Sequence, residues 1–207
     1  NFAVASRMLI GLAICLLLLL IKQQKLNTSK IAISNYIYAG LGVFVTMSLV
    51  YYSSQSIPSG IISVVFGLTP IITGVFALLL LKDPFFKFHK IAGLLLGITG
   101  LFTIFGHTLN VATEMISGLL AVTFAMAFQS FISVKLKQIS APISALETTT
   151  GALIISVPLF IISWLLTEGS VPTITLKAAL SIGYLAVFGS VIGFMSYYYL
   201  IRHASVR

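Results

Sequence analysis

The stretch FAVASRMLIGLAICLLLLLI, residues 2–21, contains one charged side chain, Arg7, and is followed at once by KQQK, residues 22–25. A helix rises about 1.5 Å per residue, so a stretch of this length crosses the ~30 Å hydrocarbon core of a bilayer. It has no basic start and no small-residue cleavage site, so it is not a signal peptide. The stretch therefore predicts a transmembrane helix that ends at a cluster of cations.

Six further apolar stretches of similar length follow along the chain. The seven expected spans are 2–21, 33–54, 58–81, 90–106, 114–134, 142–166 and 177–201. The chain is 58% hydrophobic and 8% charged, whereas about a quarter of the residues in a soluble domain are charged. We expect an all-α fold, a polytopic transmembrane helix bundle with short connections.

The basic residues gather in alternate connections. Ten of the twelve lie after the first, third, fifth and seventh spans, and one, Lys177, lies in the other connections. The ten are Lys22, Lys25, Lys30, Lys82, Lys87, Lys90, Lys135, Lys137, Arg202 and Arg207. Basic loops stay in the cytoplasm, so we expect a multi-pass protein of the cell (inner or plasma) membrane with these Lys-rich turns cytoplasmic.

Signatures of enzymes, metal sites and nucleic-acid binding are missing from the sequence. It has a single cysteine, Cys15, and its three histidines (His89, His107 and His203) fall at helix ends or in loops on different sides. It contains no H-E-x-x-H, G-x-S-x-G or phosphate-binding glycine loop. Its net charge of +8 is explained by cations facing anionic lipid headgroups. We therefore expect no catalysis, cofactor, metal or nucleic-acid partner.

A weak internal repeat relates helices that run in opposite directions. The segment starting at Tyr51 aligns with the one starting at Tyr198, and Gly42 then falls on Gly189. The matched spans are five apart, and five is odd, so the two copies cross the membrane in opposite senses. Inverted repeats of this kind build the central solute site of many transporters.

Several short motifs, in their order and spacing, resemble the EamA domain of the drug/metabolite transporter superfamily. They are Phe2 to Arg7, Tyr51-Tyr52, Ile57-Pro58-Ser59-Gly60, Leu68-Thr69-Pro70-Ile71, Leu80-Leu81-Lys82-Asp83, Gly93, Tyr198-Tyr199-Leu200 and Ala204-Ser205. Lys82-Asp83 departs from the family's usual Gly-Glu by losing the glycine. The resemblance implies a ten-helix carrier with two inverted five-helix repeats, of which this sequence would hold helices two to eight. Residues 1–106 would belong to the first repeat and 113–207 to the second, with the first helix and the last two beyond this sequence.

The function implied is secondary, non-ATP transport of small organic metabolites or drugs by alternating access, with export favoured. The expected partners are the solute and the lipid bilayer, and a homodimer stays open as an alternative to a monomer. A seven-helix receptor or sensor is the competing hypothesis, although the outer turns carry no cysteine pair and the last span has no mid-span lysine for a retinal. A structural membrane protein without a solute would explain the helices but not the repeat.

Arg7 and Glu147 are the charged candidates for function. A charge near the membrane centre costs about 2.5–3.5 kcal/mol on insertion scales and usually faces a cavity or a partner. Arg7 is therefore expected to bind solute, with snorkelling to the nearby interface as the alternative. Glu147 is a candidate for proton coupling, or simply an acid favoured by a helix N-terminus.

Tyr38, Pro70 and Tyr184 complete the expected solute-binding set with Arg7. Pro70 and Pro158 lie inside expected spans, where a proline frees a backbone carbonyl and can mark a cavity. Small polar residues lie near the middle of several spans: Thr46, Ser48, Ser63, Gln129, Ser130, Ser133, Ser190 and Ser196. Each of these could equally be a packed helix contact.

Overall fold

The computed structural model describes residues 2–82, 95–96, 99–100, 103, 115–139, 141–167, 169 and 174–203. Most of the expected span 90–106 and the turn 107–112 lie outside the described residues, as do Asp83, Gly93 and Ala204-Ser205.

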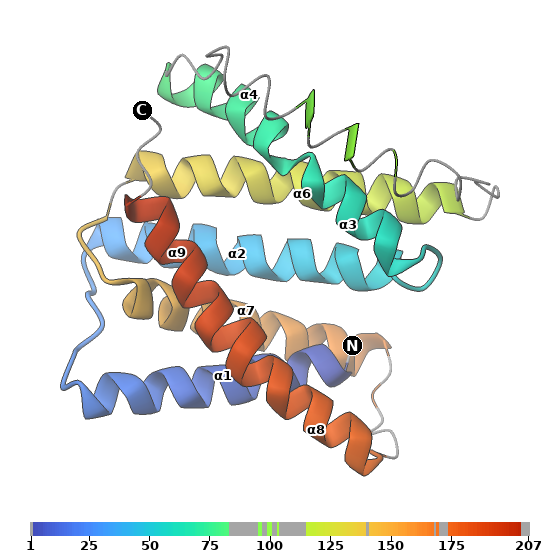
Figure 1. The fold of residues 1–207 in the computed structure, drawn as a ribbon. Coiled ribbons are helices and arrows are strands. Elements are labelled where there is room, and N and C mark those ends of the chain that lie inside the picture. Colours follow the sequence, from blue (N-terminus) through green and yellow to red (C-terminus); the bar gives the residue numbers. More distant parts are fainter. Residues whose placement is uncertain are drawn as a thin grey trace. The chain divides into compact units, whose positions relative to one another are not determined.

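All regular structure in the described residues is helical (Figure 1). The helices are α1 (Phe2–Ile21), α2 (Lys30–Ser53), α3 (Ser59–Gly67), α4 (Thr69–Leu81), α6 (Met115–Ile139), α7 (Ala145–Thr167), α8 (Leu176–Tyr184), the π-helical η2 (Leu185–Ile192) and α9 (Gly193–His203). With α3–α4 and α8–η2–α9 each counted as one span, six of them are long and apolar enough to cross a membrane. The predicted all-α transmembrane bundle is confirmed.

Two prolines inside expected spans have different effects on the backbone. The span 59–81 breaks at Leu68, and Pro70 occupies the first turn of α4, where its missing N–H leaves no hydrogen bond unmade. By contrast, α7 continues through Pro158 as one helix. Pro70 therefore interrupts its span as expected, whereas Pro158 does not end its helix.

The chain divides into two compact units, which we describe separately. Unit 1 comprises Asn1–Phe44 and Ile139–Ser205, and unit 2 comprises Val45–Gln138. Unit 1 contains α1, the first part of α2, and α7 to α9, whereas unit 2 contains the rest of α2 with α3, α4 and α6.

In unit 1, α1 and α7 pack against each other in opposite directions. Phe2 lies edge to face on Trp164, with ring centroids 5.5 Å apart, and Gly11 lies beside Leu153. The α8–η2–α9 span crosses both helices, with η2 on α1 and α9 on α7 (Figure 1).

The first half of α2 packs along α7 in the same direction. Tyr36 lies on Gly151, and Gly40 lies against Ile155. One turn further, the rings of Phe44 and Phe160 meet edge to face at 5.0 Å. On α2 these contacts recur every four residues, which is the spacing of one face of a helix. Without a hydrophobic drive in lipid, such close contacts hold helices together.

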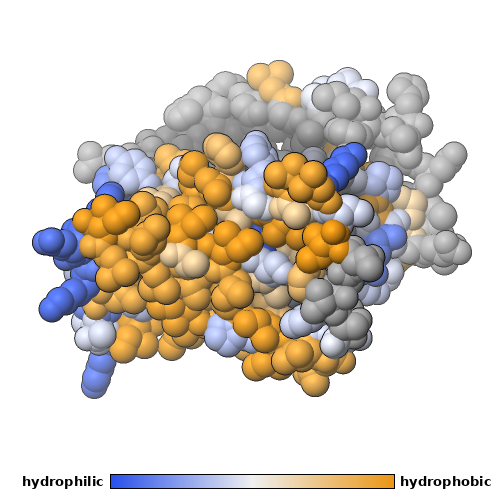
Figure 2. Space-filling view, turned by 90° about the horizontal axis from the view of Figure 1, so that it is seen from below, coloured by the Kyte–Doolittle hydropathy of each residue, from blue (hydrophilic) through white to orange (hydrophobic). Residues whose placement is uncertain are grey.

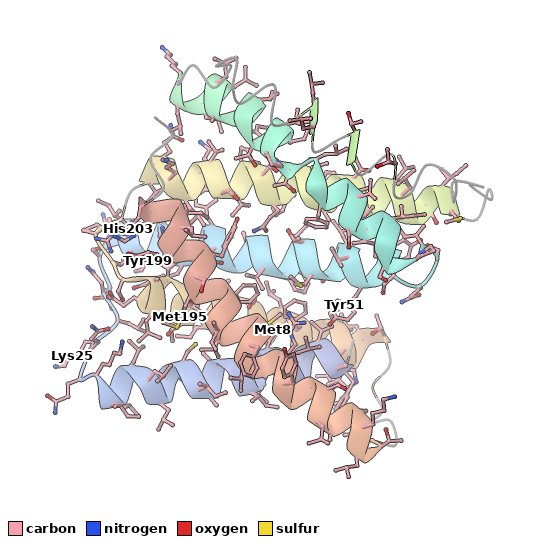
Figure 3. All side chains as sticks on the ribbon, viewed as in Figure 1. Met8, Lys25, Tyr51, Met195, Tyr199 and His203 are labelled. Atoms are coloured by element: carbon pink, nitrogen blue, oxygen red, sulfur yellow. The ribbon has the colours of Figure 1, made fainter. Side chains whose placement is uncertain are left out.

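The basic ends of the unit 1 helices lie together. The helix α1 is antiparallel to α7, and α2 is parallel to it. The connection between α1 and α2, which carries Lys22 and Lys25, therefore lies at the end where α7 begins. At that same end Arg202 of α9 donates from Nη1 to the carbonyl of Ile143, 2.6 Å away. Figure 3 shows Lys25 and His203 at this end.

Unit 2 has its own apolar core between α3 and α6. Its buried members are Ile57, Val65, Val122 and Met126. The α4 helix adds an edge-to-face contact between Phe76 and Phe131, with centroids 5.6 Å apart.

Large apolar side chains cover much of the surface. Figure 2 shows a face that is mostly hydrophobic, with hydrophilic residues mainly at its edges, many of them on the left. Leu17, Leu20 and Leu166 are 56%, 75% and 81% exposed, and a soluble protein would not leave so much continuous apolar surface in water. Lipid is the solvent that suits this surface.

Candidate functional site

Arg7 is buried inside unit 1. Its side chain is 8% exposed, and its Nε donates a hydrogen bond of 3.0 Å to the hydroxyl of Ser190. Snorkelling would instead extend the guanidinium along the helix toward water. The described geometry therefore places Arg7 toward the protein interior, on the side of α1 that faces η2.

Ser190 joins two polar contacts at the centre of this cluster. Its oxygen accepts from Arg7, and its hydroxyl lies 3.7 Å from the sulfur of Met8, to which it donates. Ser190 has no exposed surface. Met8 lies on α1 near the place where the last span crosses it (Figure 3), so the three side chains make one buried group.

The backbone around Ser190 is irregular. Residues Leu185–Ile192 are π-helical between the two α-helical halves of the last span. Short π-helical turns inside α-helices occur frequently at functional sites. A glycine on α1 allows the close approach: a Cβ on Gly11 would lie 3.2 Å from the Cβ of Ser190.

α7 contributes a run of buried hydroxyls to unit 1. Thr149 and Thr150 donate to the carbonyls of Ala145 and Leu146, one turn earlier. The hydroxyl of Ser156 is also completely buried, yet it has no hydrogen-bond partner in the described structure. A buried polar atom without a partner is uncommon and requires an explanation.

The other members of the expected solute-binding set are placed differently from Arg7. Tyr184 is 62% exposed and stacks on Phe188, with ring centroids 4.7 Å apart. It borders a shallow surface hollow made by its own helix, with Lys177 and Ser181 among the lining residues. Tyr38 is partly buried in α2. Pro70 is exposed and belongs to unit 2. Solute binding by these residues stays a prediction.

Glu147 takes part in a reciprocal cap at the start of α7. Its carboxylate accepts from the backbone N–H of Ser144 at 2.7 Å, and its own N–H donates to the Ser144 hydroxyl at 3.2 Å. This is the capping box, in which two unpaired N–H groups of a helix start are satisfied together. The contact agrees with the alternative of an acid favoured by a helix N-terminus, and proton coupling stays a prediction.

Unit 2 has a second polar group inside its helices. Thr46 of α2 donates to the side-chain oxygen of Gln129 of α6, 3.0 Å away, and Ser53 donates to the carbonyl of Gly118 at 2.8 Å. Ser130 is completely buried, and its hydroxyl has no partner in the described structure. Hydrogen bonds of this kind hold helices together in lipid.

Three features of these sites were not expected from the sequence. Ser156 looks like any small residue in an apolar span. The π-helical turn carries no distinctive sequence signal beyond Gly189 and Gly193 at its end. The cap at Glu147 could have been expected, because Ser144-Ala145-Leu146-Glu147 fits the S-x-x-E pattern of a capping box.

The described residues contain no group of three or more histidine, cysteine or acidic side chains placed to hold a metal ion. The polar chemistry that this part of the chain offers is one buried guanidinium with hydroxyls and an amide. Such groups can orient a solute by hydrogen bonds and charge.

Comparison with known proteins places this arrangement in a family. The chain is 29% identical over 153 residues to the protein called "Uncharacterized inner membrane transporter YedA" of Escherichia coli (strain K12), a match that covers 73% of this chain and 48% of the relative. The same protein of the O6:H1 and O157:H7 strains matches equally. The chain thus spans about half the length of the curated relatives it matches.

A solved structure titled "Crystal structure of protein" has the same fold, with a TM-score of 0.78 and 19% identity. The match covers 97% of this chain and 69% of the solved one. Residues 1–106 and 116–207 match the sequence model of one protein family, the EamA-like transporters. This match confirms the resemblance that the sequence motifs indicated. The chain belongs to the EamA-like transporter family.

Proposed function

We propose that the protein is a secondary transporter of small organic solutes, metabolites or drugs, that works by alternating access and favours export. The observation that carries the proposal is the buried Arg7, held by Ser190 in the irregular part of the last span. A charge within a span is expensive in lipid and usually marks a solute or ion pathway.

Helix irregularities support the same function. The break at Leu68 and the π-helical η2 each lie within a membrane-length span. Non-helical or strained backbone at membrane depth is tolerated where it is buried in protein or lines a cavity. Discontinuous helices of this kind form the solute sites of many secondary transporters.

The comparisons support transport over the alternative of a receptor or sensor. The family is described as one of transporters, and the curated relatives are named as inner membrane transporters. The curated relatives also support location in the inner membrane. We place the Lys-rich end of unit 1 in the cytoplasm because basic turns stay there. The proposed inverted repeats, 1–106 and 113–207, rest on the internal repeat of the sequence.

Transport is tested by comparing the solutes that cells release. The protein, at its natural length, is expressed in a bacterium from which related carriers have been deleted, and small molecules in the medium and the cells are profiled. We expect at least one organic solute to accumulate in the medium. No difference in any solute between expressing and non-expressing cells would contradict the proposal.

Arg7 variants make this test specific. Arg7→Ala should lower transport tenfold or more at matched membrane abundance, since a tenfold change corresponds to about 1.4 kcal/mol of lost interaction. Arg7→Lys should restore little, because an ammonium cannot reproduce the planar fork of the guanidinium. Leu9→Ala is the control, since Leu9 lies on the same helix but is 50% exposed. Equal transport by Arg7→Ala and Leu9→Ala would remove Arg7 from the site.

Orientation is tested with reporter tags. A tag after Lys25, or one between Lys135 and Pro142, should report the cytoplasm. A tag in 107–112 or 168–173 should report the outside. Outside accessibility of the tag after Lys25 would overturn the proposed orientation.

A further inference from the structure

We infer that Arg7, Ser156 and Ser190 form the place where the protein holds a singly charged anionic group, such as a carboxylate, of its solute. The inference rests on the proposed transport function and names the class of solute. Three helices of unit 1 supply the residues: α1, α7 and the π-helical η2.

The three side chains lie at one depth. The helices α1 and α7 are antiparallel, so a later residue of α1 meets an earlier residue of α7. Phe2 lies beside Trp164, and Gly11 lies beside Leu153. Ser156 lies three residues beyond Leu153 toward Trp164, and Met8 lies three residues before Gly11 toward Phe2. Ser156 is therefore level with Met8.

Met8 also connects this level to the other two polar residues. It is the neighbour of Arg7 on α1, and its sulfur accepts from the Ser190 hydroxyl. Residues three apart on a helix share a face, so Ser156 also lies on the side of α7 that bears Leu153 and faces α1. Arg7, Ser190 and Ser156 thus surround the same turn of α1.

Ser156 is the observation that points to a missing partner. Serine and threonine hydroxyls inside transmembrane helices commonly donate to the carbonyl one turn earlier, as Thr149 and Thr150 do on this same helix. The Ser156 hydroxyl is completely buried and makes no hydrogen bond in the described structure. Leaving a buried donor unsatisfied is costly, because the group has lost its hydrogen bonds to water and gained none in the protein. A bound anion would accept this hydrogen bond.

The chemistry of the cluster favours an anion. A guanidinium stays positively charged in a protein and carries five N–H donors in a planar fork, of which Nε of Arg7 donates to Ser190. Ser190, by donating to Met8 and accepting from Arg7, fixes the orientation of that fork. One buried cation beside the open hydroxyl donor of Ser156 suits a single negative charge, because hydrogen bonds and ion pairs to a carboxylate are strong where water is excluded.

Charge-selective labelling of a cysteine at position 156 tests this inference without knowledge of the solute. Cysteines of the natural-length protein, Cys15 included, are replaced by serine, and Ser156→Cys is added. Membrane vesicles of both orientations are then exposed to two methanethiosulfonates of similar size, a sulfonate anion and a trimethylammonium cation. Each rate is divided by the rate of the same reagent with a free thiol in solution.

We expect the anionic reagent to modify Ser156→Cys at least tenfold faster than the cationic one after this correction. Adding Arg7→Gln should bring the ratio to about one, because the positive charge that attracts the anion is removed. Leu9→Cys, at similar depth but on the exposed side of α1, should not react. If Ser156→Cys does not accumulate in the membrane, Ser190→Cys gives the same comparison.

The outcomes separate this inference from the proposed transport function. Equal rates for both reagents would show a hydrated site without anion preference, which overturns the anion site and leaves transport standing. A ratio that survives Arg7→Gln, or that Leu9→Cys reproduces, would also overturn it. Failure of both reagents to react would show that solutes in water do not reach the cluster, which also overturns the anion site. Transport itself is judged by the solute profile alone.

Discussion

The contact between Tyr36 and Gly151 makes a sharp prediction about how unit 1 holds together. A Cβ built on Gly151 would lie 2.2 Å from Cδ1 and 2.3 Å from Cγ of the Tyr36 ring. Real Cβ atoms do not approach carbon atoms so closely, because non-bonded carbons reach their optimal separation at about 3.5–4.0 Å. Gly151→Ala must therefore push α2 and α7 apart or turn the Tyr36 ring out of its place.

The magnitude follows from the packing. Adding a methylene-sized group to a well-packed interface typically costs about 1–3 kcal/mol. The ring cannot move away cheaply, since Tyr36 is buried among Ala32, Ala141 and Ile143. For a chain of this size, each kcal/mol lowers the Tm by about 2–4 °C. We expect Gly151→Ala to lower the Tm by about 2–12 °C.

The assay is thermal unfolding of the purified natural-length protein in detergent, followed by the loss of the monodisperse species. Gly183→Ala is the matched control, because a Cβ at Gly183 of α8 would meet no side chain or neighbouring helix within 4 Å among the described residues. Alanine has a helix propensity up to about 1 kcal/mol better than glycine, so this variant should melt at or above the wild-type temperature. The two substitutions are chemically identical and differ only in what the new methyl meets.

A double variant separates the steric cause from any other. If the clash with the ring is responsible, Tyr36→Leu combined with Gly151→Ala should lose less stability than the two single changes together, by about 0.5–3 kcal/mol. The reasoning is refuted if Gly151→Ala has the same Tm as Gly183→Ala. It is refuted also if the two losses in the double variant simply add.

Two further predictions concern the end of unit 1 where α7 begins. Glu147→Gln should keep the cap on the Ser144 N–H, since glutamine also completes a capping box, whereas Glu147→Ala should lose about 1 kcal/mol of stability in thermal unfolding. If Glu147 also couples transport to protons, Glu147→Gln should transport without responding to an imposed pH gradient, and a retained response would reject that role. Arg202→Ala should lower stability by about 1.5–3 kcal/mol, because the charged hydrogen bond to the Ile143 carbonyl is lost. An unchanged melting curve for Arg202→Ala would show that this bond does not stabilise the helix end.

Much of the fold follows from local properties of the sequence. Residues 2–21 are long enough and apolar enough to cross a bilayer wherever they are placed, and the same holds for the other described spans. The break before Pro70 also has a local cause, since proline's ring and missing N–H disfavour a continuous helix there. The lysines lie in alternate connections, which predicts that these connections lie at the same ends of the helices. Unit 1 agrees, because the connection between α1 and α2 lies at the end where α7 begins.

The candidate site depended on contacts that no local pattern contains. Arg7 stands out in the sequence because a charge in a span is costly, but the sequence leaves open whether it faces water at the interface or the interior. The fold decided this by placing Ser190, 183 positions later in the chain, within 3.0 Å of its Nε. Tyr184 differs from Arg7: it was also expected to bind solute, but its side chain is mostly exposed in unit 1.

The sequence by itself determined the class of protein and the positions of its spans, because crossing a membrane requires only length, apolarity and satisfied backbone hydrogen bonds within each helix. It could not determine which small residues meet, since Gly40, Gly151 and Gly183 are locally alike. Only the tertiary structure distinguished them. It sets the side chain of Ile155 against Gly40 and the ring of Tyr36 against Gly151, and no described neighbour against Gly183. The physical reason is that helix packing in lipid depends on short-range contact between surfaces, which exists only once the helices are side by side.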